Sequence, residues 1–232
     1  MTERTAALAA LTAEIVDCRR CPRLVAWRER VAREKVARFR DDAYWGRPVP
    51  GFGDPGARIL IVGLAPAAHG GNRTGRVFTG DASGDFLWPA LHDAGLANRA
   101  ESRRAGDGLE LRDAYIAAPV RCAPPANRPT TAERDRCEPY LVRELRILDR
   151  VRVLIALGSF AWSSALRVIA ATGPGIPSPR PTFGHGTEVR LGPYIVLGCY
   201  HPSQQNTFTG RLTRSMLDTV VRRAVAVAGQ PA

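Results

Sequence analysis

The sequence is almost without lysine, and this absence limits the chemistry that the protein can perform. Lys35 is the one lysine among 33 basic residues, so arginine carries nearly all the positive charge. An enzyme that forms a Schiff base through its own side chain normally uses lysine. Lys35 lies in an N-terminal stretch that is dense in charge and predicted to be helical. The sequence therefore argues against catalysis through a lysine Schiff base.

Long apolar runs are also absent. No segment approaches the roughly 18 apolar residues that a membrane-spanning helix requires, and the first residues lack the charged-then-apolar order of a signal peptide. Internal repeats are missing, which excludes a repeat architecture. Hydrophobic content of 45% and charged content of 24% are ordinary for a globular protein. We expect a cytoplasmic protein with one α/β domain over residues 1–232, in which residues 1–56 form a helical N-terminal extension.

The net charge of +11 is the most unusual feature of the composition. A basic surface indicates a polyanionic partner such as nucleic acid. The preference for arginine over lysine carries less information, because together with the many alanines it is typical of GC-rich coding sequences.

Short apolar runs that favour strands alternate with helical patterns after residue 56. This alternation predicts βαβ units and a largely parallel sheet. Thr130 or Thr131 is expected to cap the helix that contains Glu133. The expected strands are 58–62, 114–118, 151–157, 187–191 and 194–200, and the expected helices are 5–16, 24–39, one beginning at Ser83, 131–148, 160–171 and 212–228.

A glycine-rich stretch, residues 63–81, follows the first predicted strand of this sheet. Open α/β sheets bind ligands beyond the carboxyl ends of their strands, and a connection this long inside a compact domain is usually functional. Two further polar segments, 119–130 and 201–206, also follow strands. In a parallel sheet the three segments meet at one edge. The alternative is that 63–81 only connects two elements.

Five cysteines occur in the chain. The two-residue spacing of Cys18 and Cys21 lets both sulfurs bind one metal. Cys122 and Cys137 complete a four-thiolate site if the N-terminal helix packs near them, whereas Cys199 lies in an apolar strand and is predicted to be a core residue. Four thiolates suit zinc and a [4Fe–4S] cluster alike. Four unrelated thiols are the remaining alternative, since a disulfide is not expected in the cytoplasm.

The stretch Gly63-Leu-Ala-Pro-Ala-Ala-His-Gly-Gly-Asn-Arg-Thr-Gly-Arg-Val-Phe-Thr-Gly-Asp81, with His201-Pro-Ser-Gln-Gln-Asn206, closely resembles the type B (family 5) uracil-DNA glycosylases. The C-x2-C…C-x14-C spacing is similar to the iron–sulfur ligand set of families 4 and 5. The resemblance implies a three-layer α/β/α fold with a central, mostly parallel sheet and N-terminal helices tied by a structural [4Fe–4S] cluster. It also implies a monomer that excises uracil from double-stranded DNA and so initiates base excision repair.

The resemblance implies roles for individual residues. Phe78 matches the aromatic residue that stacks on the flipped base, and Asp81 matches the carboxylate associated with catalysis. His201 matches the histidine that contacts the carbonyl oxygen of the base, and Asn127 matches an active-site asparagine of family 5. The implied cluster ligands are Cys18, Cys21, Cys122 and Cys137.

Base excision leaves positive charge on the sugar and negative charge on the departing base. Asp81 can stabilise the sugar cation or orient the attacking water, because fixed charge aimed at developing charge is often the largest catalytic effect. Each assignment has a structural alternative: core packing for Phe78, a helix cap for Asp81, and a turn position for His201. The candidate base-binding loop, which supplies backbone amides, is Ala65, Pro66, Ala67, Ala68 and His69.

Several basic and polar residues are candidates for contact with the DNA backbone. Ser203 begins a segment that can press on the minor groove, with Phe208 as a candidate wedge between bases. The candidate backbone contacts are Arg73, Arg76, Arg128, Ser203 and Arg211.

Two departures from family 4 favour a wider range of substrates. Family 4 relatives carry Glu where this chain has Leu64, and a base-reading Asn where it has Ala118. Both changes resemble family 5, and they favour hypoxanthine and other deaminated bases beside uracil. The competing interpretation is a metal-stapled DNA-binding protein without catalysis. An iron–sulfur electron carrier is a weaker third interpretation, because nothing else in the chain resembles a redox-partner site.

Overall fold

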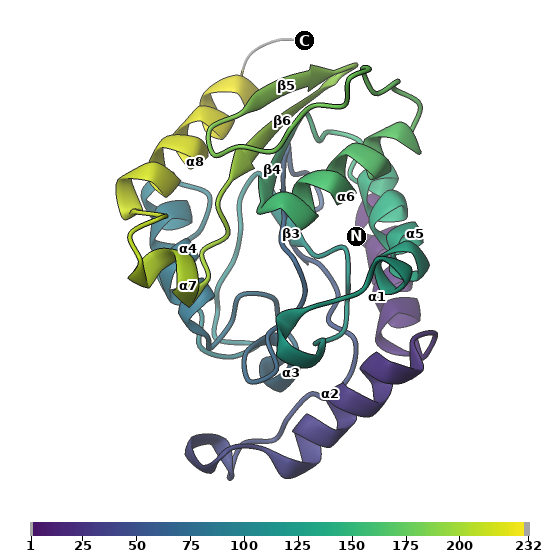
Figure 1. The fold of residues 1–232 in the computed structure, drawn as a ribbon, viewed down its shortest axis with the longest axis vertical. Helices are drawn as coiled ribbons and strands as arrows, with labels where there is room; N and C mark the ends of the chain where they lie inside the picture. Colours follow the sequence, from purple (N-terminus) through teal and green to yellow (C-terminus); the bar gives the residue numbers. More distant parts are fainter. Residues whose placement is uncertain (1, 230–232) are drawn as a thin grey trace.

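The computed structural model describes residues 2–229 as a six-stranded sheet with helices on both faces (Figure 1). The strand order is β1-β3-β2-β4-β6-β5. The strands are β1 (Phe52–Gly53), β2 (Ile59–Val62), β3 (Ala114–Ala117), β4 (Val153–Leu157), β5 (Glu188–Leu191) and β6 (Tyr194–Cys199). The helices are α1 (Glu3–Val16), α2 (Pro22–Glu34), α3 (Gly71–Thr74), α4 (Ala82–Asp93), α5 (Thr131–Ile147), α6 (Ser159–Ala170), α7 (Gln204–Phe208) and α8 (Arg214–Ala228), with 3-10 turns η1 (Ala37–Phe39) and η2 (Pro125–Asn127).

The four central strands are parallel, as the alternating sequence pattern predicts. Val62 lies opposite Ala117 of β3 and Ala156 of β4, while Leu157 of β4 lies opposite Cys199 of β6. The outer strands β1 and β5 pair antiparallel with their neighbours. The carboxyl ends of β2, β3, β4 and β6 therefore lie at one edge of the sheet.

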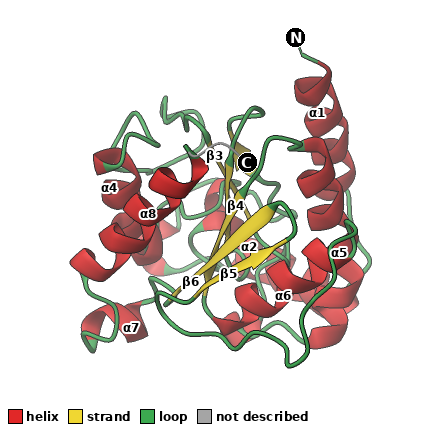
Figure 2. Ribbon diagram, turned by 90° about the horizontal axis from the view of Figure 1, so that it is seen from above, coloured by secondary structure: helices red, strands yellow, loops and turns green. Residues whose placement is uncertain are grey.

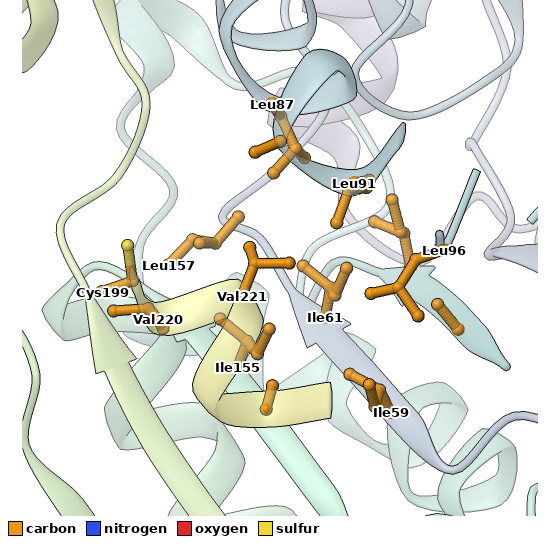
Figure 3. Close-up of a cluster of buried hydrophobic side chains, with 14 of the residues drawn as sticks. Ile59, Ile61, Leu87, Leu91, Leu96, Ile155, Leu157, Cys199, Val220 and Val221 are labelled. Atoms are coloured by element: carbon orange, nitrogen blue, oxygen red, sulfur yellow. The ribbon is translucent and has the colours of Figure 1, made fainter. Parts of the chain in front are cut away.

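Strand residues divide between two cores because successive side chains point to opposite faces of a sheet. In β2, Ile59 and Ile61 join the core formed with α4 and α8, part of which is drawn in Figure 3. Leu60 and Val62 join the core formed with α5 and α6. All four side chains are fully buried. A strand buried on both faces needs a helical layer on each side, and Figure 2 shows these layers from above.

The N-terminal helices lie beside the sheet rather than over it. Leu11 and Ile15 of α1 pack against Tyr140 of α5 in a small separate core, and the two helices run side by side in Figure 1. The single helix predicted over residues 24–39 is wrong. Helix α2 ends at Glu34 because Lys35 has a φ of 53°, a left-handed conformation that no α-helix continues. Among residues 2–229, every helix is too short or too polar to cross a bilayer.

Thr130, of the two predicted candidates, is the cap of α5. Its hydroxyl accepts the backbone N–H of Glu133 at 3.2 Å, and the Glu133 carboxylate accepts the N–H of Thr130 at 2.8 Å. This reciprocal pair is a capping box. It fixes where α5 begins, six residues before Cys137.

A buried ion pair joins α5 to the segment that follows β3. Arg121 and Glu144 are each 1% exposed, and two guanidinium N–H groups donate to the two carboxylate oxygens. Arg121 directly precedes Cys122, and Glu144 lies on the helix that carries Cys137. A buried charge that loses its partner is strongly destabilising, so each member of this pair requires the other.

Glu144→Gln tests this dependence, because it leaves the Arg121 guanidinium buried without a negative charge. We expect the free energy of unfolding, measured by urea denaturation, to fall by about 3–5 kcal/mol. Glu14→Gln is the control, since it breaks the exposed Arg143–Glu14 pair between α5 and α1, and it should cost less than about 1 kcal/mol. Equal small losses in the two variants would contradict the prediction.

Candidate functional site

Backbone hydrogen bonds fix where the loops at the sheet edge begin. The N–H of Gly63 donates to the carbonyl of Ala117 at 2.9 Å, and the N–H of Gly158 donates to the carbonyl of Cys199 at 2.8 Å. The loop after β2 therefore starts against β3, and the loop after β4 starts against β6. The stretch 63–81 is not irregular throughout, because it contains the one-turn helix α3.

Asp81 caps α4 and lies against the backbone of Gly70. Its Oδ1 accepts the N–H of Gly84 at 2.9 Å. Its Oδ2 lies where a Cβ on residue 70 would be only 2.0 Å away, so only glycine fits at that position. Burial raises the pKa of the Asp81 carboxyl, against the opposing effect of the Gly84 hydrogen bond. The capping alternative is correct, and the cap holds this carboxylate in one place.

Phe78 has a strained backbone that two neighbours accommodate. Its φ of 48° is left-handed, which costs a bulky residue on the order of 1–3 kcal/mol. The indole N–H of Trp88 donates to the Phe78 carbonyl at 2.5 Å. Gly84 leaves room for that oxygen, because a Cβ there would be 2.1 Å from it. The Phe78 ring lies near Gly63 at the end of β2.

His201 follows β6 and lies beside the Phe78 ring. The two ring centroids are 6.0 Å apart and the planes are tilted by 32°. Burial lowers the pKa of His201 to about 4. The imidazole is therefore neutral at neutral pH, with one nitrogen as donor and the other as acceptor. The side-chain amide of Asn206 donates to the backbone carbonyl of His201 at 2.9 Å, which ties α7 to this residue.

A cavity of about 250 Å³ opens beside His201, where β4 passes into α6 and β6 passes towards α7. The guanidinium of Arg211 lies over the ring of Tyr200, 4.7 Å from its centroid. The aromatic residues of this cavity were not among the predicted site residues. The sequence did contain one indication of Tyr200, because this residue directly precedes the motif histidine His201. The cavity is lined by Leu64, Leu157, Gly158, Ser159, Phe160, Phe183, Tyr200, His201, Asn206 and Arg211.

The candidate base-binding loop, Ala65 to His69, forms a compact turn after β2. The carbonyl of Ala67 accepts the N–H of Gly70 at 3.2 Å. The Nδ1 of His69 lies 3.0 Å from the hydroxyl of Tyr44, and burial lowers the pKa of this histidine. Tyr44 was not among the predicted site residues. It supports the loop from the aromatic-rich segment that precedes β1.

Two of the candidate DNA contacts point into the protein. Arg76 is 6% exposed and bonds both carboxylate oxygens of Asp107, at 2.8 and 2.7 Å. Against the effect of burial, this interaction and backbone N–H groups lower the pKa of Asp107 to about 2. Arg73 bonds Asp42 at 2.6 Å and the carbonyl of Gly80 at 3.1 Å. The prediction of phosphate contact is wrong for Arg76, and the Arg73 guanidinium is likewise held inside by its own partners.

The other candidates lie nearer the surface. Arg128 and Arg211 are exposed, and Ser203 precedes α7 as its cap residue. Phe208, at the end of α7, is 80% exposed. Asn127 is exposed with a φ of 55° in η2, and its described contacts do not reach the Phe78 and His201 rings.

Cys18, Cys21, Cys122 and Cys137 line one small cavity, whereas Cys199 lies apart in the core beneath α8. Two of the four come from the junction of α1 and α2, one follows β3, and one belongs to α5. All are free thiols. Segments separated by more than 100 residues thus bring the four cysteines around one cavity.

Four thiols around one cavity are donors of the kind that an iron–sulfur cluster takes. Within residues 2–229, no three His, Cys, Asp or Glu side chains are arranged to hold one metal ion. A cluster takes one thiolate at each iron, so its ligands stand farther apart than the four ligands of one tetrahedral zinc. Burial raises the pKa of Cys122 to about 11 and that of Cys137 to about 12. Both thiols would keep their protons until a metal displaced them.

Arg28 is a further residue of the cysteine site that the sequence analysis missed. It is 2% exposed, and its Nη1 lies 3.0 Å from the Sγ of Cys122. The spacing from Cys21 could have indicated this position. A residue seven positions after Cys21 returns to the same face of the helix after two turns.

Comparison with known proteins agrees with the motifs. The model of the family described as "Uracil DNA glycosylase superfamily" matches residues 50–224. The chain is 58% identical over 221 residues to the "Type-5 uracil-DNA glycosylase" of Mycobacterium bovis, covering 94% of this chain and 81% of that protein. Identity to the protein of the same name is 51% over 228 residues in Thermus thermophilus, with 98% and 99% covered. In Pyrobaculum aerophilum it is 48% over 215 residues, with 93% and 91% covered.

The resemblance stated from the sequence is therefore confirmed at the level of the family. The family match begins before β1 and ends within α8, so it includes the whole sheet. It also includes the loops that carry Phe78, Asp81 and His201. The chain belongs to the uracil DNA glycosylase superfamily.

Proposed function

We propose that this protein is a monofunctional uracil-DNA glycosylase, which hydrolyses the N-glycosidic bond of uracil in double-stranded DNA and so initiates base excision repair. One observation carries the proposal: the rings of Phe78 and His201 lie 6.0 Å apart at the sheet edge, and Phe78 is three residues from a fixed carboxylate, Asp81. The names of the type-5 relatives support uracil in DNA as the substrate.

The target base must leave the duplex before any side chain can act on its glycosidic bond. Phe78 offers the everted base an aromatic face, and stacking of this kind contributes about 1–3 kcal/mol. The strained backbone of Phe78, held by Trp88 and Gly84, supports a ring whose position is set in advance of binding. The Ala65 to His69 turn supplies backbone amides around the base.

Hydrolysis adds water to C1′ of the sugar, and the bonding electrons of the C–N bond leave with the base. Asp81 acts as a fixed negative charge that stabilises the cationic sugar or orients the water. The neutral His201 donates a hydrogen bond to O2 of the departing base as that oxygen gains negative charge. The proton lost by the water is taken up by the base or by solvent. No covalent bond to the protein forms in this scheme.

The absence of a lyase step follows from the position of the one lysine. The ammonium of Lys35 donates to the carbonyl of Arg40 at 2.9 Å, just beyond α2. A lysine that forms a Schiff base must reach the sugar at the sheet edge, and Lys35 is engaged in the N-terminal region instead.

Binding of DNA rests on the net charge of +11 and on exposed residues near the sheet edge. We assign phosphate contacts to Arg128 and Arg211, a backbone contact to Ser203, and contact with the base edge to Asn127. Phe208, with 80% of its surface exposed, is assigned as a wedge that enters the minor groove. The protein acts as a monomer in this scheme.

The range of substrates extends beyond uracil to hypoxanthine and other deaminated bases. Leu64 lines the cavity beside His201, and Ala118 is 3% exposed just beyond β3. Neither side chain provides a hydrogen-bonding group. A site rejects analogues most strongly when its own buried polar groups would be left unpaired, so these two apolar residues support weaker discrimination among bases.

We further assign a [4Fe–4S] cluster to Cys18, Cys21, Cys122 and Cys137. When bound, the cluster supplies a structural cross-link and takes no part in the hydrolysis. The four cysteines belong to the α1–α2 junction, the segment after β3, and α5. Their thiolates would hold the N-terminal helices against the rest of the domain.

Incubation with a uracil-containing duplex, followed by alkali, tests the proposed activity. We expect strand breaks at the uracil with the wild type, and an excision rate at least about 100-fold lower with Asp81→Asn, since the variant lacks the negative charge. Asparagine caps a helix as well as aspartate does, so stability and duplex affinity should change little. Parallel losses of rate and affinity would indicate a folding role, and no strand breaks with the wild type would favour the non-catalytic DNA-binding protein.

The pH dependence of excision separates the roles of Asp81 and His201. Burial raises the pKa of Asp81, and protonation removes the charge that catalysis needs. The single-turnover rate should therefore fall on acidification with a midpoint above the ordinary aspartate value of about 3.9. His201, with a pKa lowered to about 4, should add no inflection near the ordinary histidine value of about 6.5. An inflection there that disappears in His201→Gln would contradict a neutral histidine.

Iron content tests the proposed cluster. We expect a brown protein, and Cys18→Ala should lose both its colour and its solubility because one iron loses its protein ligand. Cys199→Ala is the matched control, since Cys199 is equally a free thiol but lies in the core away from the other four. It should keep its iron. Iron retained at the wild-type level in Cys18→Ala would remove that residue from the ligand set.

A further inference from the structure

Arg28 is buried without a carboxylate of its own. Its side chain is 2% exposed, and the carboxylate of Glu29 lies 3.9 Å away. That carboxylate is already bonded to Arg19 at 2.5 Å. Among residues 2–229, no group hydrogen-bonds the buried Nε of Arg28. Because burial of an unpaired charge is costly, this guanidinium requires another source of negative charge.

The close contacts of Arg28 are with two of the four cysteine residues. Its Nη1 lies 3.0 Å from the Sγ of Cys122, and its Nη2 donates to the backbone carbonyl of Cys18 at 3.2 Å. The side-chain amide of Asn72 donates to the carbonyl of Arg28 at 3.2 Å and anchors the backbone of α2. The guanidinium thus bridges the α1–α2 junction and the segment after β3.

Two charged residues that line the cysteine cavity already have ion-pair partners, whereas Arg136, which hydrogen-bonds Cys21, is exposed. Arg121 is paired with Glu144, and Glu133 is paired with Arg23. The Arg28 guanidinium differs from that of Arg121 by its direct contact with sulfur, and from that of Arg136 by its burial.

We propose that Arg28 is the counter-charge of the metal cluster, bound to the Cys122 thiolate and holding α2 in place through the negative charge of the cluster. This inference rests on the proposed [4Fe–4S] assignment. A cluster with four thiolate ligands is an anion. It therefore supplies the negative charge that no carboxylate near Arg28 provides. Hydrogen bonds and positive charge at cluster sulfurs raise the reduction potential. Outer groups of this kind typically change metal affinity by 10- to 100-fold.

The test compares three variants of the full-length, iron-loaded protein. Arg28→Met removes the charge and keeps an unbranched apolar side chain, whereas Arg28→Lys keeps the charge. Arg30→Met is the matched control on the same helix, because Arg30 is half exposed and stacks on Trp27. The measurements are the reduction potential, by spectroelectrochemical titration, and the rate of iron loss to a chelator.

We expect Arg28→Met to have a more negative reduction potential and to lose iron about 10- to 100-fold faster than the wild type. Arg28→Lys should recover most of the potential, and Arg30→Met should match the wild type. An unchanged potential in Arg28→Met, or an equal shift in Arg30→Met, would overturn the role of Arg28. If Arg28→Met fails to accumulate, Arg28→Lys decides. A wild-type reduction potential and a wild-type rate of iron loss in Arg28→Lys would support the role of charge. Departure of both quantities from the wild-type values would overturn it. A wild-type protein without iron would instead overturn the cluster assignment itself.

Discussion

The candidate site at the sheet edge depends on the parallel, in-register alignment of the four central strands. Val62, Ala117 and Ala156 lie side by side, so β2, β3 and β4 end at the same level. A shift of register would move a loop along the strand direction and separate Phe78 from His201, which lie 123 residues apart in sequence. The alignment is stabilised from both faces, because alternate strand residues are buried in two separate cores.

Close backbone approaches give the site its rigidity. Gly70 admits the Asp81 carboxylate, and Gly84 admits the carbonyl of Phe78. Asp81 also caps the helix on which Gly84 and Trp88 lie. One short helix therefore positions both the charge and the aromatic ring. A charged group that is fixed before the reaction stabilises a transition state without first having to reorient, so the role of Asp81 as a helix cap is compatible with the catalytic role proposed for it.

The cysteine site and the candidate site at the sheet edge share a small core. Leu24 of α2 packs with Val120 and Cys122, and the partly buried residues around them include Ala65 and Phe160. Ala65 belongs to the turn after β2, and Phe160 lines the cavity beside His201. The N-terminal helices thus support the loops at the sheet edge through direct packing. The proposed cross-link at the cysteines would therefore act on the loops at the sheet edge through this core.

The sequence by itself determined the parallel sheet, the family and the start of α5 to within one residue, because each depends on local periodicity, on capping preferences or on a long contiguous motif. Only the tertiary structure decided which arginines are paired inside the protein and which are exposed at its surface. Arg76 and Arg211 are equivalent as sequence, but Arg76 is neutralised by Asp107, 31 residues away. Arg28 likewise contacts Cys122 across 94 residues. The charge balance of an arginine is set by partners that only folding brings near, and no local pattern records them.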